Sequence, residues 1–297
     1  MKNTLLSGIF CLAIFALPKV IYSQEIPKDS VGLYVVKTND DNEYVGSILS
    51  QNADVIVLKT EALGEITIQR KNIKSIAAVG KGQIVEGKYW FENPHTTRYF
   101  FQANGYGLRR GEGYYQNTWI FFNQVSYGIT DNITLGAGMV PLFLFSGTSS
   151  PFWITPKVSV PIVKDKFNVS AGAFVGTILG EDTDGPFGIV YGNATYGPRD
   201  HNITVGLGYG FAGGEWSDTP AISVSGMARA GKKFAFMMEN YFLDAGDENV
   251  TISLLGGRFI GKSIAVDAAL VLPVSEFGND FVAIPWLGIN VPFGNRK

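Results

Sequence analysis

From residue 98 onward, apolar and polar positions alternate in a series of segments separated by turn residues. In the stretch ITVGLGYGF, for example, Ile203 and Val205 alternate with Thr204 and Gly206. A period of two is that of a β-strand, in which successive side chains point to opposite faces. The pattern therefore predicts strands with one apolar face and one face of small or polar residues.

We expect twelve such segments. They are 98–108, 116–128, 133–145, 152–163, 167–179, 187–196, 202–212, 220–230, 233–243, 249–259, 263–274 and 281–293. Each has the length of about 9–11 residues that a tilted membrane strand needs, with some overhang, and bacterial outer-membrane barrels have an even number of strands. The fold class predicted for 98–297 is all-β, a transmembrane antiparallel up-and-down β-barrel of about 12 strands.

The connections between these segments alternate in length and in charge. The short ones, which carry Lys and Arg, are 130–132, 164–166, 197–201, 231–232 and 261–262. The longer ones, which carry most of the Asp and Glu, are 109–115, 146–151, 180–186, 213–219, 244–248 and 275–280. Outer-membrane barrels have short periplasmic turns and longer external loops, with aromatic girdles at both interfaces. Aromatic residues near both ends of most segments agree with this prediction.

Residues 31–79 form a separate pattern of five short strands, which predicts a small SH3-like or Sm-like β domain. The stretches DVIVLKT and GEITIQRKNIKSI loosely resemble Sm-like domains. RNA binding does not follow from that resemblance, because the few Lys and Arg form no aromatic-interleaved basic patch. We expect a periplasmic adaptor or packing module, joined to the barrel by a linker over 80–97.

The N-terminal residues 1–23 have the order of a signal peptide. Lys2 gives a positive start, Leu5 to Leu17 is apolar, and Ser23 is a small residue at the expected cleavage site. The apolar run is shorter than the roughly 20 residues of a membrane helix. Cys11 is the only cysteine, so the mature chain is expected to have no disulfide and no thiolate chemistry.

The composition supports a membrane barrel rather than a soluble or nucleic-acid-binding protein. Only 17% of residues are charged, against about 25% in soluble domains, and the chain has 36 glycines and a mean hydropathy of +0.12. Loss of residues 1–23 would remove Lys2 and Lys19 and leave an acidic excess. Outer-membrane lipid and lipopolysaccharide are the expected surroundings, and no nucleic-acid partner is expected.

The stretch NPHTTRYFF, the later run GEGYYQNTWIFFNQVSYGITDNITLGAG and the closing WLGINVPFG resemble uncharacterised outer-membrane barrel proteins of Bacteroidota. The resemblance covers most of residues 90–297. It implies a barrel in the outer membrane and brings no activity with it.

Motifs for enzyme chemistry are missing from the sequence. The two histidines, His95 and His201, are expected in the linker and in a periplasmic turn, whereas an outer-membrane phospholipase needs His and Ser together near the outer rim. The sequence has neither a G-x-S-x-G elbow nor an H-E-x-x-H motif. The glycines of 206–214 alternate with apolar residues and precede no helix, so they do not form a phosphate loop. We expect no enzyme and no cofactor.

One acidic loop is a weak candidate for a metal site. Glu181, Asp182 and Asp184 in GEDTDGP resemble a fragment of a calcium-binding loop, without its distal glutamate. A solvated acidic loop is the favoured interpretation, so no metal is expected. Such loops would share divalent ions with lipopolysaccharide phosphates.

The predicted lumen-facing residues are the best candidates for a site. By alternation these are Gln102, Asn104, Lys157, Ser159, Asn168, Ser170, Ser223, Ser225, Arg229, Glu239 and Asp267. We expect Lys157 and Arg229 to pair with Glu239 and Asp267, since buried charges need partners. The favoured role of that network is to cross-link the interior of the barrel. Alternatively, it would line a polar path, which would be narrow because twelve strands enclose less space than a 16–18-stranded porin.

Two functions of different classes follow. The first is a narrow channel for small solutes with a periplasmic adaptor domain, in which Lys157→Ala or Asp267→Ala lowers conductance or changes selectivity. The alternative is a closed structural or interaction platform whose 31–79 domain binds a periplasmic protein. A soluble lipid-binding β-barrel is a weaker third hypothesis.

Overall fold

The computed structural model describes residues 32–79, 83–85, 88–145, 149–180, 185–244, 249–273 and 283–294. The chain divides into two compact units, one ending at Lys81 and the other beginning at Gly82. The expected signal peptide and the candidate metal ligands Glu181, Asp182 and Asp184 lie outside the described residues.

The smaller unit is a five-stranded antiparallel sheet. Its strands are β1 (Leu33–Thr38), β2 (Glu43–Gln51), β3 (Val55–Thr60), β4 (Gly64–Gln69) and β5 (Ile73–Val79), with a short 3₁₀ turn over Arg70–Asn72 before β5. The order is β4-β3-β2-β1-β5, so the last strand returns beside the first. Val36, Leu58 and Ile68 form its core. The prediction of five short strands in this region is confirmed.

The larger unit contains a closed barrel of twelve long strands. These are β8 (Glu112–Thr118), β9 (Phe122–Gly128), β10 (Ile133–Met139), β11 (Ser150–Val163), β12 (Phe167–Leu179), β13 (Phe187–Tyr196), β14 (His201–Ala212), β16 (Ala221–Gly231), β17 (Phe234–Asp244), β18 (Asn249–Ile260), β19 (Ala265–Pro273) and β20 (Ile284–Gly294). Each strand pairs antiparallel with the next, and β20 pairs with β8 from Gly288↔Thr118 to Gly294↔Glu112. The predicted all-β architecture and strand number are confirmed.

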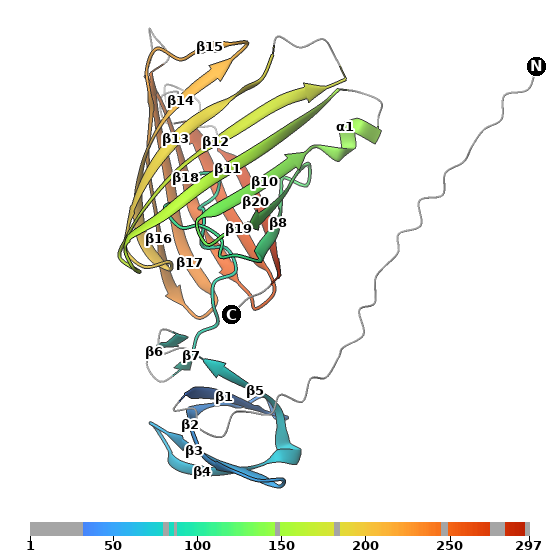
Figure 1. Cartoon of the computed structure of the whole chain (residues 1–297), viewed down its shortest axis with the longest axis vertical. Coiled ribbons are helices and arrows are strands. Elements are labelled where there is room, and N and C mark those ends of the chain that lie inside the picture. The colour runs from blue at the N-terminus through green and yellow to red at the C-terminus, as the bar shows by residue number, and fades with distance from the viewer. Residues whose placement is uncertain are drawn as a thin grey trace, which may run out of the picture. The chain divides into compact units, whose positions relative to one another are not determined.

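Four short elements accompany the barrel. The dipeptide strands are β6 (Ile84–Val85), β7 (Lys88–Tyr89) and β15 (Glu215–Trp216), and α1 (Pro141–Phe145) follows β10 (Figure 1). Within the described residues, no helix is long and apolar enough to cross a bilayer.

Three of the predicted strands are wrong in their bounds. The expected strand 133–145 ends as β10 at Met139 and is followed by α1. The segment 98–108 contains only an isolated bridge between Arg98 and Ala103, and the expected strand 116–128 is a hairpin of β8 and β9 with a turn at 119–121. This turn escaped prediction because it contains none of the usual turn residues: Trp119 and Ile120 adopt φ of 51° and 70°, which favours Gly or Asn.

The two ends of the barrel differ in their connections. At the short-turn end the strands are joined by 129–132, 164–166, 197–200, 232–233 and 261–264. At the other, long-loop end lie the connections 119–121, 140–149, 180–186, 213–220, 245–248 and 274–283. Residues 109–111, expected in an external loop, instead lie at the short-turn end, where Arg110 N donates to Asp131 Oδ1 at 2.9 Å.

The wall is apolar outside and polar inside, as the alternation predicts. On β14, Val205 is 53% exposed, whereas its neighbour Thr204 is fully buried. The ionic residues in the middle of the strands, such as Lys157, Glu239 and Asp267, are also buried in the interior. This is the reverse of a soluble barrel, whose apolar side chains fill the inside.

Candidate functional site in the barrel lumen

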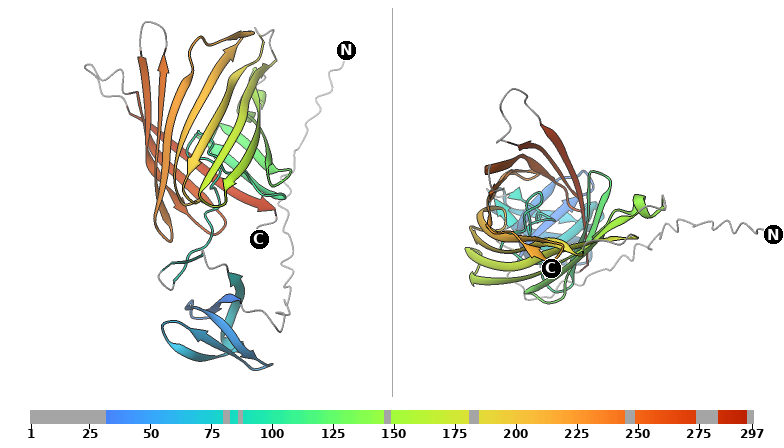
Figure 2. Two further views of the ribbon diagram at one scale, coloured as in Figure 1. Left: turned by 60° about the vertical axis from the view of Figure 1, so that its left-hand side comes forward. Right: turned by 90° about the horizontal axis from the view of Figure 1, so that it is seen from above.

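Residues 91–111, called here the inserted segment, run inside the barrel instead of forming part of its wall (Figures 1 and 2). The segment enters at the short-turn end, where Arg229 Nη2 donates to Phe91 O at 2.9 Å. It turns back around Phe101 and leaves at the same end, where Gly111 N donates to Gly128 O at 2.9 Å. Tyr99 and Phe100 are completely buried. The segment therefore occupies the short-turn half of the lumen.

The tip of the inserted segment is bound by a carboxylate of the wall. Glu239 on β17 accepts the backbone N–H of Phe100 at 3.0 Å, that of Phe101 at 3.1 and 3.2 Å, and that of Gln102 at 3.1 Å. Tyr241 donates its hydroxyl to the same carboxylate at 2.5 Å. Hydrogen bonds to a charged group contribute about 1.5–3 kcal/mol each, more than neutral ones. Glu239 thus binds three successive backbone N–H groups of the tip through charge-assisted hydrogen bonds.

A lysine of the wall holds both limbs of the segment. Lys157 Nζ on β11 donates to Thr97 O at 3.1 Å on the ascending limb. On the descending limb it donates to Asn104 O at 3.3 Å and to Tyr106 O at 2.6 Å. These three acceptors use all three protons of the ammonium group.

Arginines complete the attachment. Arg258 on β18, fully buried, donates to Asp267 at 2.6 and 2.9 Å, and also to the carbonyls of His95 and Tyr99. Arg199 in the β13–β14 turn donates to Thr96 Oγ1 at 2.9 Å and to Gly107 O at 3.1 Å.

Tyr106 adds an anchor from the segment to the wall. Its hydroxyl donates to Gly197 O at 2.6 Å. Burial raises the pKa of Tyr106 above its ordinary value of about 10, which adds to the preference for the protonated phenol that already holds at neutral pH.

The expected pairing of Lys157 and Arg229 with Glu239 and Asp267 is wrong. Arg229 pairs with Asp200 at 2.7 Å and Asp267 with Arg258, while Lys157 and Glu239 bind the inserted backbone. The alternation pattern did not reveal this because it assigned residues 98–108 to the wall and so placed no segment of the chain inside the lumen.

The other expected lumen residues are buried in the structure, and two of them lie on the inserted segment. Gln102 donates to Asn193 Oδ1 at 3.3 Å, and Asn104 donates to Thr96 O at 2.9 Å within the segment. The expected serine and asparagine side chains of the wall are all buried: Ser159, Asn168, Ser170, Ser223 and Ser225.

Sequence reasoning missed Arg98, Arg199, Asp200 and Arg258 as lumen residues. Arg258 had a usable signal, since Phe259 beside it is outward-facing and Arg258 lies opposite Asp267 in the register. His95, expected in a linker, is buried against the Tyr114 ring, with 4.4 Å between centroids; His201 is exposed at the start of β14. Among the described residues no group of His, Cys, Asp and Glu is arranged for a metal.

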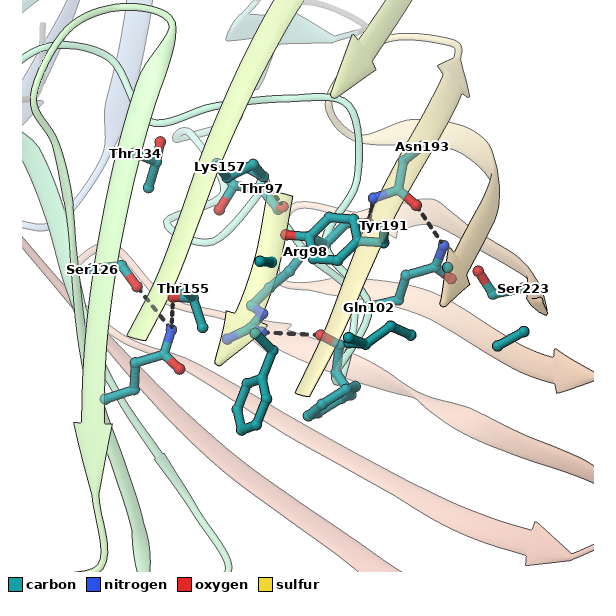
Figure 3. Close-up of a pocket in the computed structure, with 18 of the residues that line it drawn as sticks. Thr97, Arg98, Gln102, Ser126, Thr134, Thr155, Lys157, Tyr191, Asn193 and Ser223 are labelled. Atoms are coloured by element: carbon teal, nitrogen blue, oxygen red, sulfur yellow. Dashed lines mark hydrogen bonds between the residues drawn. The ribbon is translucent and has the colours of Figure 1, made fainter. Parts of the chain in front are cut away.

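Two cavities adjoin the tip of the segment. The smaller, about 100 Å³, has the polar side chains of Lys157, Tyr191 and Asn193 among its lining (Figure 3). The larger, about 390 Å³, lies toward the long-loop end and is lined mainly by aromatic rings. Its lining is Arg98, Phe100, Phe101, Gln116, Thr118, Trp119, Phe122, Gln124, Pro151, Trp153, Phe174, Phe187 and Trp286. Arg98 lines both cavities.

No protein-family model matches this sequence, and no curated protein matches it either. Among solved structures, the NanC porin is similar at 10% identity and a TM-score of 0.41, covering 63% of this chain and 98% of that one. A loop L8 deletion mutant of OmpT, an outer-membrane protein of Vibrio cholerae, is similar at 14% identity and a TM-score of 0.34, covering 88% and 96%. Outer-membrane-expressed OmpT of Vibrio cholerae is similar at 14% identity and a TM-score of 0.31, covering 91% of this chain and 100% of that one.

Proposed function

We propose that the chain is an outer-membrane β-barrel that conducts small solutes when the inserted segment moves, and that this segment closes it in the conformation described here. The observation that carries the proposal is the attachment of the segment's backbone by Glu239 at the tip and by Lys157 on both limbs. The wall closes through its own hydrogen bonds between β20 and β8. It therefore does not need the segment to complete its sheet.

The membrane placement rests on the surface of the barrel. In hydrocarbon every backbone polar group must be satisfied internally, which a closed sheet achieves. An apolar outer face on the described strands suits such surroundings. By the rule that periplasmic turns are short, the short-turn end would face the periplasm, and the chain enters the barrel at that end.

A charge on the outer face tests this placement. Val205→Arg is expected to lower the free energy of unfolding by about 2–4 kcal/mol, the cost of an arginine at the bilayer midplane. The measurement is equilibrium unfolding of the mature chain in phospholipid vesicles. Leu63→Arg, at a position 61% exposed in the small unit, is the matched control and should change stability by less than about 0.5 kcal/mol. Equal effects of the two variants would contradict the membrane placement.

Weakening the attachment tests whether the inserted segment is a gate, that is, whether it blocks the lumen until it moves. Lys157→Met removes the three hydrogen bonds to the segment's carbonyls, a loss of at least about 1.5 kcal/mol, which shifts the closed-to-open equilibrium about tenfold. We therefore expect ion current through planar bilayers to rise about tenfold. The contacts of Lys157 thus reverse the decrease expected from the sequence. Lys166→Met, in the exposed β11–β12 turn, should leave the current unchanged, and an unchanged current in Lys157→Met would contradict the gate.

A closed platform is the second candidate, favoured by the filling of the short-turn half of the lumen. In it, the 31–79 domain, which we propose is SH3-like and periplasmic, binds a periplasmic protein. This function predicts no current from any segment variant. It also predicts a co-purifying protein that is lost when residues 31–79 are deleted.

A further inference from the structure

Three neighbouring strands of the wall are shorter than a membrane crossing requires. β8, β9 and β10 have seven residues each, whereas the other nine long strands have 9–14. A tilted membrane strand needs about 9–11 residues. At the long-loop end, residues 284–287 of β20 extend beyond the last pair of β8 (Thr118↔Gly288), and residues 150–151 of β11 extend beyond the last pair of β10 (Met139↔Phe152). The wall is therefore lowest at the long-loop ends of these three strands.

The low part of the wall ends in apolar residues. The β8–β9 turn has the sequence Trp119-Ile120-Phe121 and is followed by Phe122, and Ile120 is 76% exposed. Beyond β10, α1 exposes Leu142 and Phe143. We call residues 119–122 and 141–143 the low rim. Turns that face water are generally polar, so a turn of this composition suits hydrocarbon.

The aromatic cavity lies directly behind the low rim. Trp119 contacts Trp286 with ring centroids 4.8 Å apart and Phe122 at 6.1 Å, and Phe122 contacts Trp153 at 6.2 Å. Phe122 belongs to both the rim and the cavity lining, and it is 41% exposed. The lumen of a water-filled barrel is polar, whereas this half is lined by rings. The lining therefore suits an apolar ligand.

Arg98 gives this cavity one cationic group. Its Nη1 donates to Gln116 Oε1 at 2.5 Å and its Nη2 to Phe101 O at 3.0 Å. None of the described carboxylates lies within ion-pair distance of Arg98, in contrast to Arg229 and Arg258. The guanidinium is only partly buried, so its remaining donors can meet an anion in the cavity.

We propose that the aromatic cavity binds a single-chain amphiphile with an anionic head, of the fatty-acid class. The carboxylate meets Arg98, the chain lies among Trp119, Trp153 and Trp286, and the ligand exchanges with the bilayer over the low rim. A volume of about 390 Å³ is near the lower end of the roughly 300–1,000 Å³ of small-molecule sites, which suits one chain. The inference shares the membrane placement of the proposed function but does not depend on the gate.

The tryptophans of the cavity provide a direct test, since three of the five in the chain line it. The full mature chain in phosphatidylcholine nanodiscs is titrated with 9,10-dibromostearate, whose bromines quench tryptophan fluorescence on contact. We expect saturable quenching. Arg98→Gln should raise the half-saturating concentration about tenfold, the value of one charge-assisted hydrogen bond, and Arg98→Lys should restore part of the affinity. Arg110→Gln, at an exposed position of the same segment, is the matched control and should bind as the wild type does.

Two further measurements separate the parts of the proposal. The methyl ester of the same brominated acid should bind wild type and Arg98→Gln equally, because it has no anionic head. Ile120→Glu should lower the rate of quenching about tenfold without changing the final extent of quenching. The reason is that a ligand entering from the hydrocarbon would have to pass the charge on the low rim. Ile129→Glu, exposed at the short-turn end, should leave the rate unchanged.

Quenching that rises linearly without saturation, equally in wild type and Arg98→Gln, would show contact with bulk bilayer chains only and overturn the site. An unchanged rate in Ile120→Glu would overturn entry over the low rim. Either failure would leave the results for Val205→Arg and Lys157→Met untouched, so it can be distinguished from a failure of the proposed function.

Discussion

Glu239→Gln is expected to raise the open probability of the barrel about 100-fold. The glutamine has nearly the same shape, but it presents one acceptor oxygen and an NH₂ group to three backbone N–H donors, from Phe100, Phe101 and Gln102. Loss of the charge and of at least one donor's partner removes about 3 kcal/mol from the attached state, which corresponds to about a 100-fold change in equilibrium. Single-channel recording of residues 24–297 in planar bilayers gives the open probability directly.

The control for this prediction is Glu215→Gln, which makes the same chemical change on an exposed residue of the long-loop end. Its open probability should match that of the wild type. If Glu239→Gln opened the barrel no more often than Glu215→Gln did, the tip would be held by packing of Tyr99 and Phe100 rather than by the carboxylate. The segment would then be a permanent filling, and the platform function would be favoured.

The wall of the barrel was largely predictable because the alternation within each strand shows which side chains face outward and which face the lumen. Ile203, Val205 and Leu207 are exposed, and Thr204 and Gly206 are turned inward, as period-two alternation requires. Such a pattern is local, so it is readable without knowing the neighbours of a strand. The same alternation in 152–163 predicted β11 (Ser150–Val163) to within two residues.

The inserted segment was not predictable by the same reasoning. Residues 98–108 are surrounded by polar wall side chains, and their backbone groups bond to side chains such as Glu239 and Lys157 instead of to a ladder. Their own sequence therefore needs no regular alternation. The length and charge of a strand do not show whether an inward lysine meets a carboxylate or a carbonyl, which is why the ion pairs were assigned wrongly.

Arg258→Met is expected to destabilise the barrel by about 3–5 kcal/mol, because it leaves the carboxylate of Asp267 buried with Asn290 as its remaining partner, at 3.0 Å. That is the range for removing one member of a buried ion pair. Equilibrium unfolding in phospholipid vesicles measures the change in the free energy of unfolding. Arg110→Met, which alters an exposed arginine, should change it by less than about 0.5 kcal/mol.

The double variant Arg258→Met/Asp267→Leu separates the two duties of Arg258. Because it removes the buried charge as well as its partner, most of the stability should return. The carbonyls of His95 and Tyr99 that Arg258 binds would still lack their donor, so the open probability should remain raised. If stability recovers while the open probability stays raised, the ion pair stabilises the wall of the barrel and the carbonyl contacts hold the inserted segment in the closed position. A double variant as unstable as Arg258→Met would instead show that the contacts between Arg258 and the inserted segment, and not its pairing with Asp267, stabilise the barrel.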